Sequence, residues 1–304
     1  MMQKKLNKDG EEVYVFDQYP DIEVRPDVIT MADIKRVYPP AAKHPRLVKR
    51  LMKLFEIDEV NRVHGRWSMT PGPEFVKHLV EDEFKVDLHV DNLEILERFK
   101  TGAFITVSNH PFGQLDGIVL IYLVTRVRPE FKVMVNMILN QLSAMRPNFI
   151  AVDQGASADP EKRRVSVAGV REAIRMLREG MPVGFFPAGA IGKTDKEGII
   201  VDRQWQPTVL QIISKAKVPV IPIYFHGTNS RMFNFFGHHS ILLRTLCLAR
   251  ELFRKRNKPL RVTIGEPVSV EKQLEFGKDY EALGQYLRRQ TYLLSGKEIT
   301  SVAK

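Results

Sequence analysis

The chain has 304 residues, of which 44% are hydrophobic and 27% charged. It therefore has enough apolar residues to form a packed core, and a wholly disordered protein is excluded. Lys and Arg outnumber Asp and Glu by 46 to 36, giving a formal net charge of +10. A single cysteine, Cys247, excludes an intramolecular disulfide and a cysteine-based zinc cluster, which fits a reducing compartment. The longest stretch without a charged residue, 101–115, is shorter than the roughly 18 apolar residues of a membrane-spanning helix. The polar N-terminus also lacks a signal-peptide core, so the sequence predicts a soluble or peripheral protein.

The first ninety residues are predicted to contain a polar lead-in followed by helices. Residues 1–40 are polar with scattered prolines, which indicates a loosely structured segment. Helices are predicted over 46–57 and 74–84, the second opened by Pro73 at a first-turn position. A short helix is expected over 92–99.

From residue 103 onward, β-rich runs alternate with helical ones. The predicted strands cover 103–108, 131–135, 149–152, 182–186, 218–225 and 260–264, and the predicted helices cover 116–125, 159–178, 208–215 and 271–294. This alternation predicts an α/β fold with a mostly parallel central sheet flanked by helices, an N-terminal helical segment, and chemistry at the carboxyl ends of the strands. We divide the chain into 1–90, an α/β domain over 91–270 and a C-terminal helix with a short tail over 271–304, together one compact unit.

The positive charge is concentrated in two segments. Residues 43–53 carry five basic and no acidic side chains, and residues 244–261 have a net charge of +6, so the remaining chain is close to neutral. Such patches favour an anionic partner, either a lipid surface or an acidic carrier protein. A nucleic-acid partner is not expected, because neither a known motif nor interleaved aromatic residues accompany the cations. The second segment is typical of a basic amphipathic helix at a membrane surface, although an ordinary solvated helix face fits it equally well.

Several nucleotide, hydrolase and metal motifs are absent. The sequence Gly192-Lys193-Thr194 resembles the end of a phosphate-binding loop, but Pro187 stands where its first glycine is required and a polar turn follows. The sequence contains no G-x-S-x-G, G-x-G-x-x-G or H-E-x-x-H. Neither a nucleotide loop nor a metal centre is therefore predicted.

The strongest candidate for chemistry is the segment Ser-Asn-His-Pro-Phe-Gly-Gln-Leu-Asp-Gly at 108–117, directly after the first strand of the α/β region. His110 is a side chain suited to accept a proton near neutral pH, and Asp116 could fix its tautomer by bonding one ring nitrogen. The alternative is that Asp116 only caps the following helix and His110 is an ordinary loop residue. The pattern alone leaves both open.

Two further segments follow strands or form them. Residues 185–190, Phe-Phe-Pro-Ala-Gly-Ala, end a strand in a turn of small residues whose backbone N–H groups can bind an anion. Residues 218–224 form a strand with Pro219 at its start and Pro222 in its middle, and the second proline predicts an edge strand or a bulge.

In this order, the three segments resemble the motifs of the glycerolipid acyltransferases, the family of lysophospholipid and glycerol-3-phosphate acyltransferases, over about residues 90–270. The first two are similar to the branch named after hemolysins, which is related to acyltransferases of ornithine- and glycine-type aminolipids. Five residues separate His110 from Asp116 where the family has four. Ala188 replaces a glutamate that the family associates with a phosphate-bearing acceptor, which disfavours glycerol 3-phosphate.

The resemblance implies direct acyl transfer. His110, oriented by Asp116, would remove the proton from the hydroxyl of a lysophospholipid or lyso-aminolipid, which would attack the thioester of acyl-CoA or acyl-carrier protein. These thioesters are substrates, and no bound cofactor is expected. Turn amides near Gly189 are candidate oxyanion donors. The predicted substrate-binding residues are Asn109, Gly113, Arg146, Phe186, Pro187, Gly189, Lys193 and Arg203.

A lipid substrate implies membrane contact, which we expect on the cytoplasmic face as a peripheral or monotopic protein. The predicted contact residues are Phe233, Phe235, Phe236, Arg250 and Arg254, although core packing explains the phenylalanines equally well. Two other functions remain open: a non-enzymatic lipid-binding or membrane-lytic protein, and a thioester hydrolase that uses the same His–Asp pair with water as acceptor.

Overall fold

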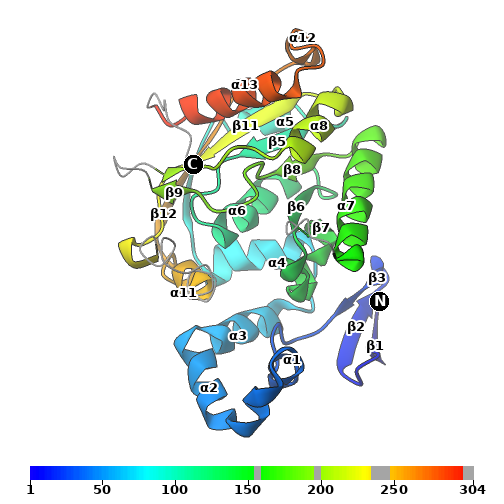
Figure 1. Cartoon of the computed structure of the whole chain (residues 1–304), viewed down its shortest axis with the longest axis vertical. Coiled ribbons are helices and arrows are strands. Elements are labelled where there is room, and N and C mark those ends of the chain that lie inside the picture. The colour runs from blue at the N-terminus through cyan, green and yellow to red at the C-terminus, as the bar shows by residue number, and fades with distance from the viewer. Residues whose placement is uncertain (154–158, 195–199, 234–246, 297–304) are drawn as a thin grey trace.

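The computed structural model describes residues 1–153, 159–194, 200–233 and 247–296, and its centre is a seven-stranded sheet (Figure 1). In spatial order, the strands are β4 (Asp87–Asp91), β12 (Pro259–Ile264), β11 (Val220–Phe225), β5 (Ile105–Ser108), β8 (Val183–Phe185), β6 (Lys132–Asn136) and β7 (Phe149–Val152). The last five run parallel to one another, β12 runs antiparallel to β11, and β4 is parallel to β12. The predicted α/β class with a mostly parallel sheet is confirmed.

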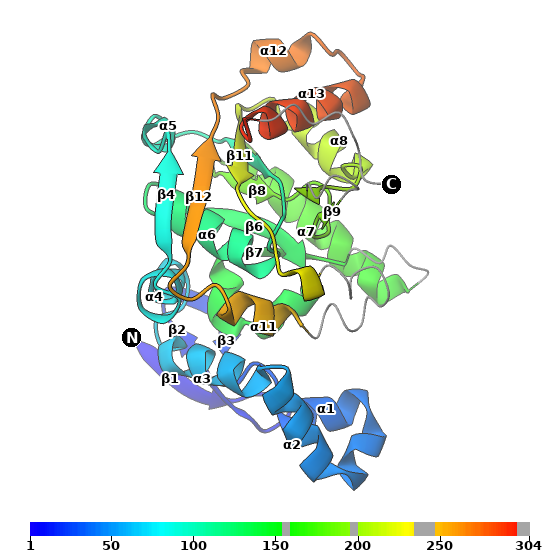
Figure 2. The same cartoon turned by 90° about the vertical axis from the view of Figure 1, so that its left-hand side faces the viewer.

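Helices cover both faces of this sheet (Figure 2). One face packs against α4 (Pro73–His78), the π-helical turn η2 (Leu79–Glu83) and α6 (Gln114–Thr125). The other face packs against α7 (Pro160–Arg178), α8 (Pro207–Ala216) and α13 (Tyr280–Leu293). Shorter helices connect these elements: α5 (Glu94–Glu97), η3 (Met137–Gln141), η4 (Ser143–Asn148), α11 (Leu248–Phe253) and α12 (Val270–Leu274).

Local sequence signals account for many of these boundaries. The helix α7 begins at Pro160, as the Asp-Pro-Glu sequence predicts. The single C-terminal helix predicted over 271–294 is instead two helices, because Gly277 adopts a positive φ of 56° and Asp279 caps the start of α13 by accepting the N–H of Ala282. Of the two alternatives predicted from Pro222, the edge position is wrong, since β11 lies inside the sheet. The bulge is present: Val220 pairs with Val268 and Ile223 with Ile264, so the register shifts by one residue across Pro222. Its missing N–H is tolerated because β12 pairs only from Ile223 onward.

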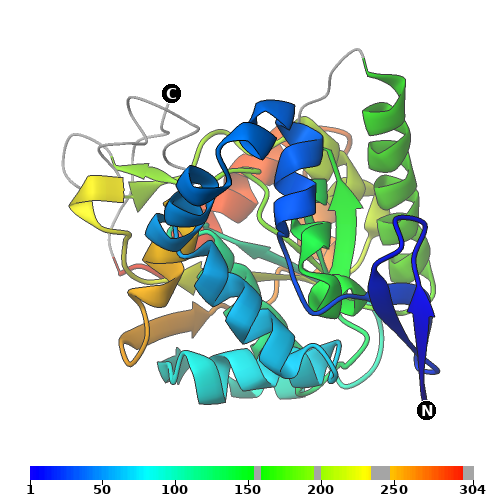
Figure 3. The same cartoon turned by 90° about the horizontal axis from the view of Figure 1, so that it is seen from below.

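The expectation of a loosely structured lead-in over 1–40 is wrong. These residues form an antiparallel sheet of β1 (Met2–Leu6), β2 (Glu12–Phe16) and β3 (Tyr19–Val24), which precedes the helical part of the segment. That part comprises α1 (Met31–Val37), η1 (Pro39–Lys43), α2 (Pro45–Leu54) and α3 (Ile57–Trp67). Seen from below, both parts lie across the lower end of the α/β body (Figure 3). The strands escaped prediction because β1 is exposed throughout and lacks an apolar alternation.

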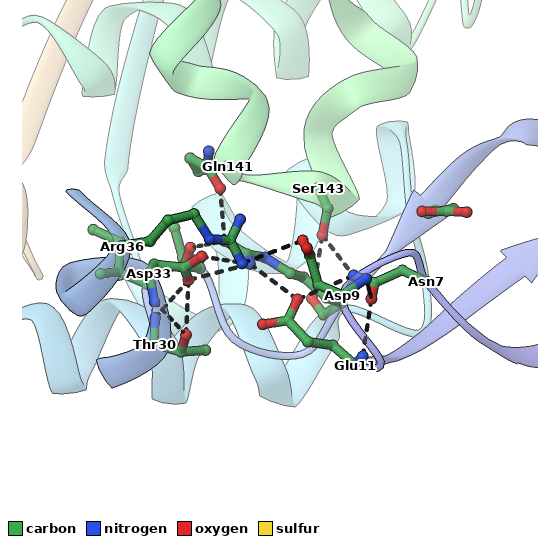
Figure 4. Close-up of polar contacts among 12 residues, drawn as sticks. Asn7, Asp9, Glu11, Thr30, Asp33, Arg36, Gln141 and Ser143 are labelled. Carbon is green, nitrogen blue, oxygen red and sulfur yellow. Dashed lines mark hydrogen bonds and ion pairs between the residues drawn. The ribbon is translucent and has the colours of Figure 1, made fainter.

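Arg25, directly after β3, ties this small sheet to the body. Its backbone N–H donates to Ser143 Oγ at 3.0 Å, and its guanidinium donates to Gln141 Oε1 at 2.6 Å. The same guanidinium lies 3.2 Å from Asp33 and 3.5 Å from Glu11. Figure 4 shows these acidic and polar partners converging from the N-terminal sheet, α1 and the η3–η4 segment.

His64 on α3 makes a second link between the N-terminal segment and the body. The buried ring accepts the Ala144 N–H at Nε2 (3.2 Å), so its proton is on Nδ1, which donates to the Pro26 carbonyl at 2.8 Å. The bond from Ala144 requires the neutral ring, because a protonated Nε2 cannot accept, and burial lowers the pKa of His64, opposed by the bond to the Pro26 carbonyl. Nearby Arg25 and Arg146 act in the same direction as burial.

Replacing His64 by Gln should therefore have a pH-dependent effect on stability. The unfolded ring binds its proton more tightly, so the stabilisation from His64 is complete above its unfolded pKa of about 6.5 and is lost as pH falls below it. The loss is about 1.4 kcal/mol for each unit by which folding lowers the pKa. We expect the free energy of unfolding in urea to be higher for wild type than for His64→Gln, with a gap that is largest at pH 8 and narrows toward pH 5. A gap that stays constant over this range would contradict the neutral-ring link.

Candidate active site

His110 lies where β5 ends, at the carboxyl edge of the parallel strands. The fully buried strand β5 pairs with β11 on one side and β8 on the other, which fixes the direction in which the chain leaves the sheet. Asn109 extends this pairing: its Nδ2 donates to the Phe225 carbonyl at 3.0 Å, and its Oδ1 accepts the Phe225 N–H at 2.7 Å. The Asn109 amide, predicted to bind substrate, therefore holds the ends of two strands together and positions the residue that follows.

Asp116, in the first turn of α6, caps that helix and also lies beside the ring of His110. Its buried Oδ2 accepts the N–H groups of Phe112 and Gly113, each at 2.9 Å, which closes the turn and caps the helix. The same oxygen lies 3.0 Å from Nδ1 of His110, at ion-pair distance although not aligned as a regular hydrogen bond. Burial raises the pKa of Asp116, while His110 and the two amides oppose that rise.

The turn between these two residues depends on Gly113. Its φ is +88°, and a Cβ there would lie 2.7 Å from Cδ1 of Ile191. No other residue type fits without strain and a clash. The fifth residue between His110 and Asp116 is accommodated at this glycine.

The backbone of His110 is held from both sides by a short hairpin, β9 (Lys193–Thr194) and β10 (Ile200–Val201). Just before β9, the Gly192 N–H donates to the His110 carbonyl at 2.9 Å. Just after β10, Asp202 Oδ1 accepts the His110 N–H at 3.3 Å. The histidine ring packs on Phe186, with ring centroids 4.2 Å apart, and its side chain remains 18% exposed. A fixed, accessible imidazole at a sheet edge can act as a general base.

Asp202 is a buried carboxylate that the sequence analysis missed. Burial raises its pKa to about 6, opposed by His110 and Arg288, and its own N–H donates to Tyr292 Oη at 2.8 Å. Its neighbour Arg203 was predicted to bind substrate instead, and the Arg203 side chain is exposed. The sequence did offer one signal for Asp202. It directly follows two β-branched residues, Ile200 and Val201, and precedes Trp205, which is buried in the structure.

The turn after β8 brings Phe186 and Pro187 beside His110, but its amides are partly in use. The Gly189 N–H donates to the Phe186 carbonyl at 2.9 Å, and the Pro187 carbonyl accepts the Gln206 N–H at 2.9 Å. The Gly189 N–H is therefore engaged within the turn, and the oxyanion role expected of the turn amides near Gly189 stays a prediction for its neighbours. Lys193 is half-buried on β9, one residue after Gly192.

Arg146 lies in a different environment from the other predicted binding residues. Its guanidinium donates to the carbonyls of Asn140 (2.6 Å) and Glu23 (3.2 Å), which braces the η3–η4 segment against β3. Burial lowers the pKa of Arg146. This arginine is thus part of the junction with the N-terminal sheet.

Of the predicted membrane contacts, Phe233 is fully buried, so its assignment is wrong: the ring packs inside the protein. Phe235 and Phe236 lie outside the described residues. Arg250 and Arg254 are exposed on and just after α11. Within the ranges that the structure describes, no helix is both long and apolar enough to cross a bilayer, and no three His, Cys, Asp or Glu side chains are grouped to hold a metal ion.

Comparison with known proteins gives consistent relatives. A family model described as Acyltransferase matches residues 34–299. The lyso-glycine lipid O-acyltransferase of Bacteroides thetaiotaomicron is 28% identical over 231 residues, which cover 73% of this chain and 80% of the relative. The protein of the same name from Phocaeicola vulgatus is 26% identical over 255 residues, covering 80% and 88%.

Among solved structures, the 1-acyl-sn-glycerophosphate (LPA) acyltransferase PlsC from Thermotoga maritima aligns with a TM-score of 0.48 at 19% identity, over 75% of this chain and 80% of that chain. The family assignment depends on the family model, which matches most of the chain. The protein therefore belongs to the acyltransferase family and is an acyltransferase, as its sequence motifs predicted.

Proposed function

We propose that the protein is membrane-associated and transfers a fatty acyl group from acyl-CoA or acyl-carrier protein to the hydroxyl of a lyso-lipid, with His110 as general base. The observation that carries this proposal is the accessible His110 ring, fixed at a sheet edge with Nδ1 at 3.0 Å from the buried Asp116 carboxylate. This arrangement orients one ring nitrogen toward Asp116 and leaves Nε2 as the candidate base.

The proposed reaction needs only one base that later acts as an acid. Nε2 of His110 takes the proton of the acceptor hydroxyl while that oxygen attacks the thioester carbonyl carbon. A carbon–oxygen bond forms, the carbon–sulfur bond breaks, and the proton passes from the imidazolium to the leaving thiolate. Asp116 supports the imidazolium with its negative charge, as the acid of a catalytic triad does. The products are an ester and a free thiol.

For the acceptor, we propose a lyso-aminolipid. Both relatives are named for lyso-glycine lipid, and Ala188 stands where the family resemblance places a glutamate associated with a phosphate-bearing acceptor. Ala188 is buried in the turn beside Phe186 and carries no group able to bind a headgroup. A lysophospholipid is the alternative acceptor that an acceptor panel would reveal.

For membrane contact, we propose α2 in place of Phe233. None of the side chains on α2 is buried, and Leu47, Leu51 and Leu54, at i, i+4 and i+7, are 54%, 42% and 57% exposed. Leucines at this spacing share one face of the helix. Basic residues occupy other positions on α2, which has no acidic residue, and the helix projects away from the α/β body (Figure 2). An apolar stripe beside cations suits an anionic lipid surface.

The first test replaces His110 by Ala and follows radiolabelled acyl thioester with a panel of lyso-lipids. We expect transfer to fall about 10²- to 10⁴-fold, because the general base is lost. His89→Ala, which changes an exposed histidine on β4, is the matched control and should leave transfer unchanged. Label recovered only as free fatty acid would instead show a hydrolase, and lipid binding or lysis without any transfer would show a non-enzymatic protein.

A second test separates the charge of Asp202 from its shape. Asp202→Asn keeps an oxygen that can accept the His110 N–H but removes the negative charge of the carboxylate. Burial raises the pKa of Asp202 to about 6, so we expect the Asn variant to have a lower kcat/KM than wild type above pH 6, where the wild-type carboxylate is charged, and to approach wild type below pH 6. Asp202→Ala also loses the acceptor and should lower kcat/KM at every pH. If the Asn variant keeps the wild-type profile, Asp202 acts only through its hydrogen bond.

A third test examines α2 with vesicles of neutral lipid with and without anionic lipid. Leu47→Ser combined with Leu51→Ser removes two exposed apolar groups and should weaken co-sedimentation with the anionic vesicles at least about tenfold. Binding by the wild type should also fall as salt rises. Leu274→Ser, at a similarly exposed leucine on α12, serves as the control. Equal loss in both variants, or in neither, would exclude α2 as the specific contact.

A further inference from the structure

A pocket of about 320 Å³ lies at the same edge of the sheet as His110, between the turn that opens α6 and the segment joining α11 to β12. Phe112 and Leu115, both from the stretch between His110 and Asp116, form part of its apolar wall. Residues 228–230, which follow β11, supply polar groups. Three cationic residues contribute to the lining: Arg254, Lys255 and Lys258.

The pocket is fixed rigidly to the catalytic turn. Asn229 is buried, and its Nδ2 donates to the carbonyls of Phe112 (3.1 Å) and Pro111 (3.3 Å). Gly227 approaches so closely that a Cβ there would lie 2.7 Å from Cζ of Phe112. A group bound in the pocket is therefore held in a defined relation to His110, two residues before Phe112.

Glu251, the acidic residue of the pocket, is already committed to its polar wall. Its buried carboxylate accepts the Ser230 N–H at 2.9 Å and the Ser230 hydroxyl at 2.6 Å. Its ion pair with Arg254 is long, 3.6 Å. The pocket thus has one acid, engaged in hydrogen bonds, against three cations.

The Lys255 ammonium is held in place without a salt bridge. It donates to the Thr228 carbonyl at 2.8 Å and lies 4.5 Å from the centroid of the Phe112 ring. Burial lowers the pKa of Lys255, opposed by Glu251 and by Asp116, so the field of the Asp116 carboxylate extends to this ammonium. In the described part of the chain, neither Lys255 nor Lys258 forms an ion pair within 4.0 Å.

Other cations of the same basic segment are neutralised locally. Arg256 lies 2.7 Å from Glu59 and 3.5 Å from Glu83, and Arg261 lies 2.7 Å from Asp91. The contrast shows that, among the cations lining the pocket, Lys255 and Lys258 bring positive charge that no carboxylate in the described part of the chain pairs with. A partly buried cation without a counterion is costly, and an anion in the pocket would relieve that cost.

We propose that this pocket binds the anionic end of the acceptor headgroup, with Lys255 as the central contact and Arg254 and Lys258 beside it. The proposal takes its ligand from the proposed function. A lyso-lipid whose glycine is attached through its amino group ends in a free carboxylate. A lysophospholipid carries a phosphate. Both therefore present an anion a few bonds from the linkage that joins the headgroup to the lipid. Arg254, predicted as a membrane contact, is assigned to this pocket.

The test uses water-soluble ligands, so that binding is measured apart from membranes and turnover. N-butanoylglycine and N-butanoylglycinamide differ in the charge of one terminal group. By isothermal titration, we expect the acid to bind wild type at least about tenfold more tightly than the amide. Lys255→Gln should weaken binding of the acid about 10- to 100-fold and leave binding of the amide unchanged. Lys215→Gln, at an exposed lysine on α8, is the matched control.

A second variant and a kinetic measurement complete the test. Lys258→Gln changes an exposed residue and should also weaken binding of N-butanoylglycine. It therefore tests the pocket even if Lys255→Gln does not fold. Both variants should raise the KM of the anionic acceptor and leave the KM of the acyl donor unchanged. A short-chain glycerol phosphate ester that binds better than the acid would identify phosphate as the headgroup anion. Equal binding of acid and amide, displacement of the acid by free CoA, or a raised donor KM would overturn the proposal.

Failure of the pocket and failure of the proposed function have different signatures. His110→Ala should lower transfer about 10²- to 10⁴-fold and still bind N-butanoylglycine as tightly as wild type. If no acceptor is acylated by wild type while the charge-dependent titration persists, the transfer proposal fails and the anion site stands. If transfer occurs with no difference between acid and amide, only the anion site fails.

Discussion

One carboxylate oxygen, Oδ2 of Asp116, organises the candidate site. It accepts two consecutive backbone N–H groups and also faces the imidazole of His110. The oxygen is fully buried, so each of these donors offsets part of a desolvation cost that the carboxylate would otherwise bear alone. This one oxygen therefore fixes the geometry of the turn, the start of α6 and the position of the histidine together. Gly113 permits this arrangement because it has no side chain to place in the tightest part of the turn.

A second carboxylate complements the first. Asp116 addresses the side chain of His110, while Asp202 accepts its backbone N–H and Gly192 donates to its carbonyl. The ring is therefore positioned through both its own contacts and its main chain. Preorganisation of this kind would lower the reorganisation needed if His110 acts as the proposed base and takes up a proton. The buried Tyr292 and the guanidinium of Arg288 in turn bond the main chain of Asp202, so α13 contributes to the site without reaching the substrate.

The parallel part of the fold could be predicted from the sequence because its central strands β5, β8 and β11 are buried throughout and form apolar runs. The strand β7 and the start of α7 were located to the residue, the first as an apolar run and the second through the capping signal at Asp159 and Pro160. The small N-terminal sheet could not, since β1 is exposed throughout, β3 is half exposed, and Arg25 fastens the sheet through partners more than a hundred residues away. Whether the Phe233 side chain is buried or exposed could not be predicted from the sequence either, because a phenylalanine in a polar segment is compatible with both a protein core and a membrane surface.

The functional residues divide along the same line. His110 and Asp116 were identified because they lie in one contiguous motif, whereas Asp202 becomes relevant only when β10 places it beside the His110 backbone. The basic segment at 244–261 was predicted as one helix, whereas its described part consists of the short α11, a turn and the first residues of β12. Its charges separate into paired arginines and the cations of a pocket only through carboxylates supplied by α3, η2 and β4.

The bonds that close the candidate site join residues far apart in the chain. Asn109 bonds Phe225, 116 positions later, and His110 bonds Asp202, 92 positions later. Contacts of such separation form late, because a large loop must be closed before they contribute. During synthesis, the histidine emerges long before the strand and hairpin that fix it. A nascent chain therefore carries the motif without the site, and competence for chemistry is acquired only when more than two thirds of the protein has been made.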